Sequence, residues 1–407
     1  MSGNETKEAK MDGPASLEER FAGFSTYKGT PSDAIALFAE GRRRCPVPHS
    51  NELGGFYLLL RYRDVRQALI NARTFANGPA VLRSLAEGMP RFPPIDYDPP
   101  EHTAWRRIFV NGINADTARR IAPLVRKDVI RYLDEIAPRG TCDLVADLTE
   151  RVPMSALFHV LGLGEEDHDF VRNMTLELLA SVADREAFGR VFAEFGRFGL
   201  REVERRRSEP KDDYLTALAN AEIDGRLLNA QEIAAATNSL LLAGHGTTVA
   251  AMTNMLYEVL RRPELTQALI ADPTLIPAAV EEALRLHTPF FGLYRRVTED
   301  TVVSGVPIAA GESVYVCWQS ANRDADVYPD PDEFKLDRPD RHHLTFGAGK
   351  HSCAGAATAR MELATVMEEL LRRLPDIELV DPKAAAFQFL GGETAAITCL
   401  PARFTPN

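Results

Sequence analysis

The sequence has few cysteines, no excess of basic residues and no long uninterrupted apolar run. Its five cysteines are odd in number, widely scattered and without a CxxC pair, so neither a disulfide framework nor a zinc site is indicated. A reducing cytoplasm fits this usage best. The 58 acidic residues exceed the 47 basic ones and give a net charge of −11, which argues against nucleic acid as a partner. The most apolar stretch, 234–260, includes Asn238, His245, Asn254 and Glu258, and therefore predicts a buried core helix rather than a membrane span.

The chain also lacks linkers, internal repeats and low-complexity segments, which predicts one domain over residues 21–407. Residues 1–20 are polar and charged without an apolar core, and we expect them to be a disordered leader. Helical patterning dominates the middle of the chain, and strand-like patterns are confined to short segments. The fold class is therefore mainly α with a small β part. We expect short strands at 56–60, 301–316 and 386–404, helices at 62–71 and 354–374, and loops at 76–94 and 322–339.

One decapeptide, residues 346–355, carries most of the functional information. It reads Phe-Gly-Ala-Gly-Lys-His-Ser-Cys-Ala-Gly and places Cys353 in a glycine-rich loop before an amphipathic helix. Glycines allow the backbone to approach a large flat group, and the helix N-terminus directs N–H groups and positive dipole at the sulfur. Such surroundings lower a thiol pKa and suit an axial haem ligand. The alternative is an ordinary buried cysteine.

This decapeptide resembles the haem-binding signature of the cytochromes P-450, the haem-thiolate monooxygenases. The resemblance implies the cytochrome P-450 fold, with haem b (iron protoporphyrin IX) between a long central helix and the cysteine loop. It makes Cys353 the metal ligand and gives Phe346 and Gly355 cofactor-binding positions. Because no membrane anchor is found, the resemblance narrows to the soluble bacterial-type members, which take electrons from a separate ferredoxin- or flavodoxin-type protein.

Four further residues match the family's positions for the two haem propionates. His102 and Arg106 are spaced i, i+4 after Asp98-Pro99-Pro100, so both side chains lie on one helix face. Arg295 and His351 match the remaining positions, and buried carboxylates require such donors. The alternative for each of the four is a surface cation.

Glu282 and Arg285 are spaced i, i+3 in an apolar helix and can pair on one face. A buried pair of this kind needs further hydrogen bonds, which Arg338 in the Pro- and Asp-rich segment can supply. The three residues resemble the family's Glu-Arg-Arg structural triad. An isolated ExxR pattern is otherwise a common solvated helix pair.

The predicted central helix places Leu240, Ala243, Gly244 and Thr247 on one face. Small residues there let the helix lie against a flat macrocycle, and its glycines permit a local bulge. By resemblance, Thr247 hydrogen-bonds dioxygen or its water; the alternative is a bond to its own i−4 carbonyl. The chain departs from the family at Gly246, where an acid normally precedes this threonine and helps to deliver protons.

The departure at Gly246 raises the question of a replacement proton donor. His245 is adjacent, but neighbouring residues on a helix point about 100° apart. We therefore expect His245 to be a packed or partly exposed side chain rather than a relay.

The substrate pocket is the least readable part of the sequence. Glu393 is expected in a solvated turn, because glutamate is rarely buried. The residues that the resemblance assigns to an apolar pocket wall, any of which would serve equally as plain core, are Val81, Leu82, Leu240, Phe290, Phe291, Leu293 and Thr394.

These observations predict a monooxygenase that inserts one oxygen atom from dioxygen into a small or medium apolar organic substrate. The missing acid motivates an alternative, a haem-thiolate peroxygenase or a reductase of a small gas. A third hypothesis is a non-catalytic haem sensor, against which the presence of Thr247 and an apparent pocket argue.

Overall fold

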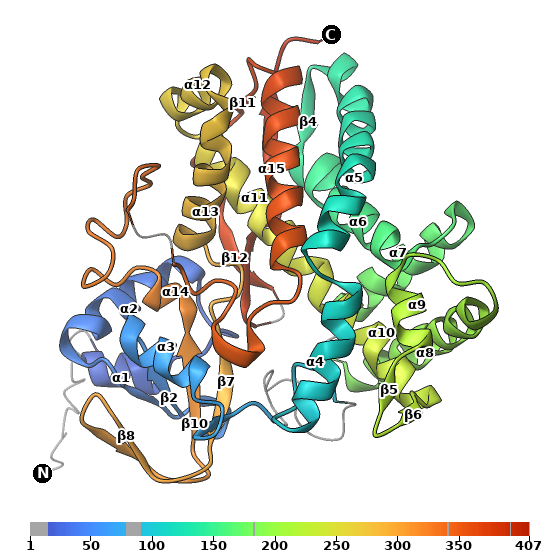
Figure 1. Cartoon of the computed structure of the whole chain (residues 1–407). Coiled ribbons are helices and arrows are strands. Elements are labelled where there is room, and N and C mark those ends of the chain that lie inside the picture. Colours follow the sequence, from blue (N-terminus) through green and yellow to red (C-terminus); the bar gives the residue numbers. More distant parts are fainter. Residues whose placement is uncertain (1–14, 79–90, 182–183, 340–341, 391, 407) are drawn as a thin grey trace, which may run out of the picture.

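The computed structural model describes residues 15–78, 91–181, 184–339, 342–390 and 392–406. Helices form most of the molecule, and short strands form small separate sheets among them (Figure 1). The α-helices are α1 (Leu17–Ala22), α2 (Pro31–Arg44), α3 (Tyr62–Ile70), α4 (Glu101–Gly112), α5 (Ala115–Ile136), α6 (Arg151–Leu161), α7 (Glu165–Ala180), α8 (Arg185–Ser208), α9 (Tyr214–Ala219), α10 (Ala230–Gly244), α11 (Gly246–Leu260), α12 (Pro263–Ala271), α13 (Ile276–Leu286), α14 (Trp318–Ala321) and α15 (Ala356–Arg373).

The largest sheet among the described residues has five strands in the order β1-β2-β10-β7-β3. In this sheet β10 is parallel to β2 and antiparallel to β7. The remaining strands form the pairs β5-β6, β8-β9 and β12-β13 and the three-stranded sheet β11-β14-β4. The strands are β1 (His49–Ser50), β2 (Phe56–Leu59), β3 (Phe75–Ala76), β4 (Thr141–Asp143), β5 (Glu222–Ile223), β6 (Arg226–Leu227), β7 (Gly292–Val297), β8 (Thr301–Val303), β9 (Val306–Ile308), β10 (Ser313–Cys317), β11 (Glu378–Leu379), β12 (Phe387–Leu390), β13 (Thr394–Ile397) and β14 (Pro401–Arg403).

The five-stranded sheet separates two small apolar cores. On β10, Val314 and Val316 pack in one core, whereas Tyr315 and Cys317 pack in the other. This alternation follows from the period of two in a strand. A third and larger core fills the helical part, where α15 packs along α5 (Figure 1). The prediction of a mainly α fold with a small β part is confirmed.

The predicted long central helix is divided in two. Helix α10 ends at Gly244 and α11 begins at Gly246, while His245 between them has φ −104° and ψ −72°. The two glycines that flank His245 are poor helix formers, so the break lies where the sequence is locally weak. In the described residues no helix combines the length and the apolarity that a membrane crossing requires.

Two other predictions need a correction or fall outside the described residues. The expected leader at 1–20 extends too far, because α1 begins at Leu17 with a capping box between Ser16 and Glu19. Most of the predicted loop at 76–94, including residues 79–90, lies outside the described residues.

Candidate functional site

The cysteine loop is held in shape by its own backbone. The N–H of Cys353 donates to the carbonyl of Phe346 at 2.8 Å, and the guanidinium of Arg360 lies 4.4 Å above the Phe346 ring. Gly347 and Gly349 have φ values of +70° and +71°, which side chains other than glycine rarely adopt. A Cβ at Gly349 would also lie 2.9 Å from the Leu69 carbonyl oxygen. Gly355 has no such constraint, since its Cβ would meet only the Cys353 sulfur at 3.9 Å.

The Cys353 thiol has the predicted neighbours but not the predicted pKa. Helix α15 begins three residues later, and the N–H groups of Gly355 and Ala356 bond to the sulfur. Burial raises the pKa of Cys353, and these N–H groups and the charges of Arg106 and Arg360 offset it only in part. The expected lowering of this pKa is therefore wrong for the protein alone. The residue is nevertheless exposed to solvent, so a metal can reach the sulfur.

The structure brings the four predicted propionate ligands together around this loop. The rings of His102 and His351 lie 4.0 Å apart between centroids, and Arg106 donates to the carbonyl of Ser352. Arg295 is 4% exposed, and burial lowers its pKa to about 10. Burial and the neighbouring positive charges lower the pKa of His351 to about 2. His102 and Arg295 are buried, and Arg106 and His351 are half-buried, so none of the four is the exposed surface cation of the alternative interpretation.

Asn77 is part of this cluster, although the sequence did not identify it. Its Nδ2 lies 3.1 Å from Nδ1 of His351 and donates to the Ile95 carbonyl. Because the amide nitrogen can only donate, the ring proton of neutral His351 is on Nε2. Asp98 holds the segment by accepting from the N–H groups of Asn77 and Gly78 at 2.9 and 3.1 Å. No local pattern in the sequence marks Asn77, which lies 274 residues from its partner.

The donor cluster fits haem. Both ring nitrogens of His102 and Nε2 of His351 are buried without a hydrogen-bond partner among the described residues. Arg295 forms no ion pair with any residue that the structure describes, and its guanidinium donates only to the Tyr294 carbonyl. Buried donors require partners, and the two carboxylates of haem would supply acceptors beside an exposed cysteine sulfur.

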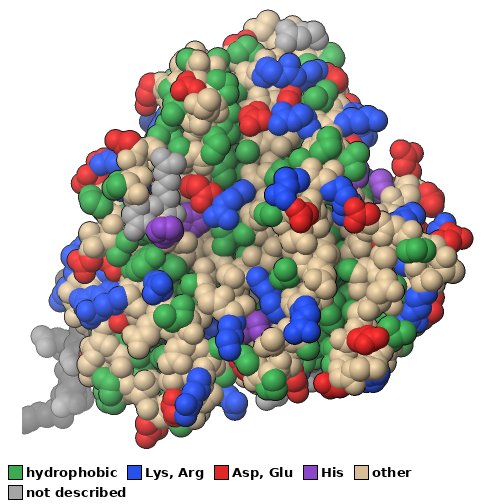
Figure 2. Space-filling view, viewed as in Figure 1, with side chains coloured by type: hydrophobic (Ala, Val, Ile, Leu, Met, Phe, Trp, Pro, Cys, Tyr) green, Lys and Arg blue, Asp and Glu red, His purple; other side chains and the backbone are tan. Residues whose placement is uncertain are grey.

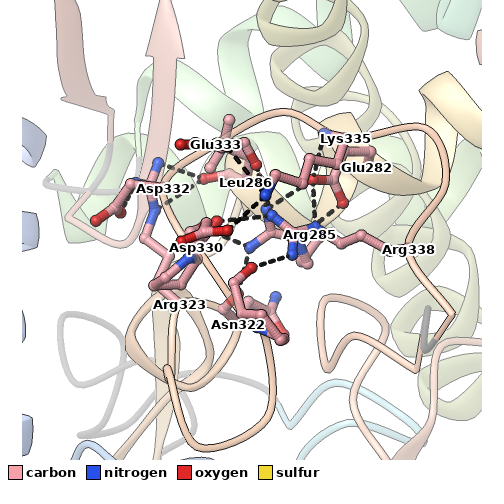
Figure 3. A network of polar contacts seen from close by, with 12 residues as sticks. Glu282, Arg285, Leu286, Asn322, Arg323, Asp330, Asp332, Glu333, Lys335 and Arg338 are labelled. Carbon is pink, nitrogen blue, oxygen red and sulfur yellow. Dashed lines mark hydrogen bonds and ion pairs between the residues drawn. The ribbon is translucent and has the colours of Figure 1, made fainter.

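The predicted structural triad is fully formed (Figure 3). Glu282 accepts from Arg285 at 2.8 Å through both oxygens and from Arg338 Nε at 2.7 Å. The two arginines also donate to backbone carbonyls of the 322–333 segment. Burial opposes ionisation of Glu282, but the two arginines outweigh it and lower its pKa. The triad thus fixes the segment that leads into the cysteine loop.

Sequence reasoning also missed Arg323, which extends this network (Figure 3). Arg323 donates to the carbonyl of Leu286 at the end of α13 and to Asp332. No sequence pattern marks Arg323, because its partner at Leu286 is a backbone carbonyl, which any residue type could provide.

At the break between α10 and α11, Thr247 Oγ1 donates to the Ala243 carbonyl at 3.0 Å. The alternative i−4 bond is therefore present. His245 is 3% exposed, with Nε2 3.2 Å from the Glu150 carbonyl, and burial lowers its pKa. These contacts agree with a packed histidine.

Ala243 is exposed and Gly244 half-buried, as a surface for a flat group requires, whereas Leu240 packs in the helical core.

The expected substrate wall is placed only in part. Phe290 and Leu293 pack in the same apolar cluster as Ala348 of the cysteine loop, and Phe290 bridges Thr394. Phe291 points elsewhere and packs with Phe38 and Phe389, because adjacent residues in extended chain face opposite sides. The prediction that Phe291 belongs to the substrate wall is therefore wrong. Val81 and Leu82 lie outside the described residues.

Glu393, expected in a solvated turn, is 2% exposed. Tyr27 donates its hydroxyl to the Glu393 carboxyl at 3.2 Å, and burial raises the pKa of Glu393 to about 8. The expectation of a solvated Glu393 is therefore wrong. The sequence could not show this burial, because its partner Tyr27 lies 366 residues away.

Basic side chains gather over α4 and the loop that precedes α15 on the face shown in Figure 2. Arg107 and Lys350 are exposed there, and Arg106 and Arg360 are half-buried. Arg360 is already paired with Glu281 at 2.6 Å. This face is therefore locally positive on a protein of net negative charge.

Comparison with known proteins agrees with this geometry. Residues 174–383 match the family model described as Cytochrome P450. A steroid C26-monooxygenase of Mycolicibacterium smegmatis is 31% identical, over 89% of this chain and 91% of the relative. A mycinamicin IV hydroxylase/epoxidase of Micromonospora griseorubida is 36% identical, over 80% and 84%. The structure of cytochrome P450 CYP109Q5 from Chondromyces apiculatus superposes with a TM-score of 0.86 at 31% identity, covering 95% of this chain and 99% of that one.

Proposed function

The chain belongs to the cytochrome P450 family of haem enzymes, and on that premise we propose that it inserts one oxygen atom from dioxygen into a small or medium apolar organic substrate. The observation that carries this proposal is the cluster of unpartnered buried donors beside the exposed Cys353 sulfur. Buried donors require acceptors, and a dicarboxylate whose metal binds the Cys353 thiolate would supply them. When bound, haem supplies the activation of dioxygen.

The haem in this proposal is the non-covalent b type. The sequence has no C-x-x-C-H attachment motif, so Cys353 and the donor cluster would hold the group without a covalent bond to the porphyrin. His351 donates from Nε2, which Asn77 fixes as the protonated nitrogen. Arg106 and Arg295 add charge-assisted hydrogen bonds to carboxylates. Ala243 and Gly244, two small residues that are exposed and half-buried, would supply a surface on which the flat group packs.

The chain's own proton-carrying group at the reacting centre is the Thr247 hydroxyl. In the described structure it donates to Ala243, and it must rotate away from that carbonyl to serve a substrate or water. Gly246 offers no acid beside it, and His245 is turned toward Glu150. Proton delivery therefore depends on water or on polar groups of the substrate.

Electrons come from a redox partner, and we propose an acidic ferredoxin-type protein that docks on the basic face around Lys350 and Arg107. Charge of opposite sign accelerates such encounters.

The function is tested with isotopically labelled dioxygen, a ferredoxin and its reductase. A library screen for displacement of water from ferric iron, followed in the Soret band, first identifies candidate substrates. Incorporation of one labelled oxygen atom per product, with consumption of reducing equivalents that depends on substrate, supports monooxygenation. Product formed only with added peroxide, and carrying peroxide oxygen, would instead identify a peroxygenase.

A further inference from the structure

A cavity of about 230 Å³ lies among α2, α11, the end of α13 and the pair β12-β13. Figure 1 shows α2 and α14 beside these elements. The lining that matters here consists of Ile35, Asn254, His287, Phe291, Phe387 and Ala395. A cavity of about 150 Å³ is enough to bind benzene, and one water occupies about 30 Å³ of liquid. The space therefore suits a small substituted ring.

This cavity is separate from the haem side of the fold. Phe291 and Ala395 border it, whereas their neighbours Phe290 and Thr394 form the bridge on the other face of the same extended segments. Adjacent side chains in extended chain point in opposite directions. A molecule in the cavity would thus lie behind the expected substrate wall.

His287 presents a bare acceptor at this cavity. Its Nε2 lies 2.6 Å from Oε1 of Glu258, and its ring stacks on Phe387 at 4.8 Å and 8°. Burial alone would raise the pKa of Glu258, but His287 and Arg262 lower it to about 2. Burial also lowers the pKa of His287. A neutral ring that donates from Nε2 to a carboxylate leaves a lone pair on Nδ1, for which the described residues provide no donor.

Asn254 also lines the cavity, but it is only 1% exposed. Its Nδ2 donates to the Ala395 carbonyl at 3.0 Å, and its Oδ1 has no partner among the described residues. By contrast, the amide of Gln319 and the guanidinium of Arg323, which also line the cavity, are engaged by protein groups. The hydroxyls of Ser32 and Thr288 also line the cavity and can donate or accept. Nδ1 of neutral His287 can only accept, and it lies beside the aromatic rings of the lining.

We infer that this cavity is a second ligand site, which takes a small amphipathic molecule with an apolar ring and one hydroxyl donor. The ring packs against Phe291 and Phe387, and the hydroxyl donates to Nδ1 of His287. Apolar lining with a few placed polar groups is the usual composition of small-molecule sites.

Titration calorimetry of the haem-loaded protein with 4-ethylphenol tests this site. The matched ligand is 4-ethylanisole, which keeps the ring but has no donor. We expect saturable binding of one equivalent of the phenol, weaker binding of the ether, and no change in the Soret band. His287→Phe keeps the stack on Phe387 but removes the acceptor, and should weaken phenol binding about three- to tenfold, the effect of one hydrogen bond.

Ile35→Trp is the second variant, because it fills the cavity from its rim and leaves every polar group intact. It should abolish phenol binding while the Soret spectrum and the thermal unfolding midpoint stay close to native. The absence of saturable binding to the native protein would overturn the inference. So would equal binding of phenol and ether, or native affinity in Ile35→Trp. If His287→Phe does not fold, Ile35→Trp and the ether decide the question alone.

Discussion

Thr247 donates its hydroxyl to the carbonyl of Ala243 at 3.0 Å, across the break that separates α10 from α11 at His245. The bond keeps the hydroxyl occupied in the resting protein, and no acid stands beside it, because residue 246 is glycine.

Gly246→Asp should raise the fraction of reducing equivalents that end in product, for a substrate without a polar hydrogen. A well-placed general acid contributes roughly 10²–10⁴-fold. A Cβ at this position would meet Leu179 at 3.7 Å, an ordinary contact. An acid in the first turn of α11 should also stabilise the helix by about 0.3–1 kcal/mol. Product and peroxide are measured per electron pair consumed, together with substrate affinity.

Gly246→Asn is the matched control for Gly246→Asp, since it has nearly the same size without the acid. Equal coupling in the two variants would contradict a role for the carboxyl. Native coupling that is already complete, and that survives Thr247→Ala, would show that proton delivery does not limit this enzyme.

Glu393→Gln should remove a pH-dependent loss of stability. The folded-state pKa of about 8 lies above the ordinary value of 4.5, so the folded state binds more protons than the unfolded state between these values. The contribution of Glu393 is fully present below pH 4.5 and is lost as pH rises through 8. The native free energy of unfolding should fall relative to Glu393→Gln by at most about 1.4 kcal/mol per pH unit. Urea unfolding from pH 5 to 8.5 measures the difference, and a constant difference would refute the buried protonated carboxyl.

Arg338→Ala should destabilise the protein by about 3–5 kcal/mol, since it leaves Glu282 without one partner of a buried ion pair. Haem content after purification should fall as well, because the 322–333 segment leads into the cysteine loop. Urea unfolding and haem absorbance give the two values. Arg403→Ala is the control: its pair with Glu378 is 60% exposed on both sides and should contribute less than about 1 kcal/mol. Equal effects of the two substitutions would argue against the triad as the support of the loop.

Lys350→Glu and Arg107→Glu should slow reduction by an acidic ferredoxin and flatten the dependence of its rate on salt, because surface charges steer association. Stopped-flow reduction under carbon monoxide at two ionic strengths measures both effects. Arg185→Glu on α8, away from the cysteine loop (Figure 1), is the matched charge reversal. If all three variants are reduced equally fast, the partner docks elsewhere.

The parts that the sequence predicted correctly depend on short spacings. The i, i+3 pair of Glu282 and Arg285 and the glycine-rich turn before Cys353 are local, so the helix period and φ preferences determine them. The alternation that points Phe290 and Phe291 in opposite directions is equally local. Which of the two faces the substrate pocket depends on how the segment packs, and the sequence alone does not show this.

The parts that escaped prediction depend on contacts between distant segments. Glu393 is buried because Tyr27 covers it, and His351 has a fixed tautomer because Asn77 reaches it. The raised pKa of Cys353 has the same origin, since the amount of protein around a thiol is a property of the whole fold. The N–H groups that lower the pKa of Cys353 were predicted correctly, but burial raises this pKa by more.

The most direct test is the absorbance spectrum of the reduced, carbon monoxide-bound protein and of three cysteine variants. We expect the red-shifted Soret band of thiolate ligation in the native protein and in Cys399→Ala, which changes another exposed cysteine. Cys353→Ala should lose the band, and Cys353→His should move it to the position of histidine ligation. A red-shifted band that persists in Cys353→Ala and disappears in Cys399→Ala would contradict the assignment of Cys353 as the metal ligand.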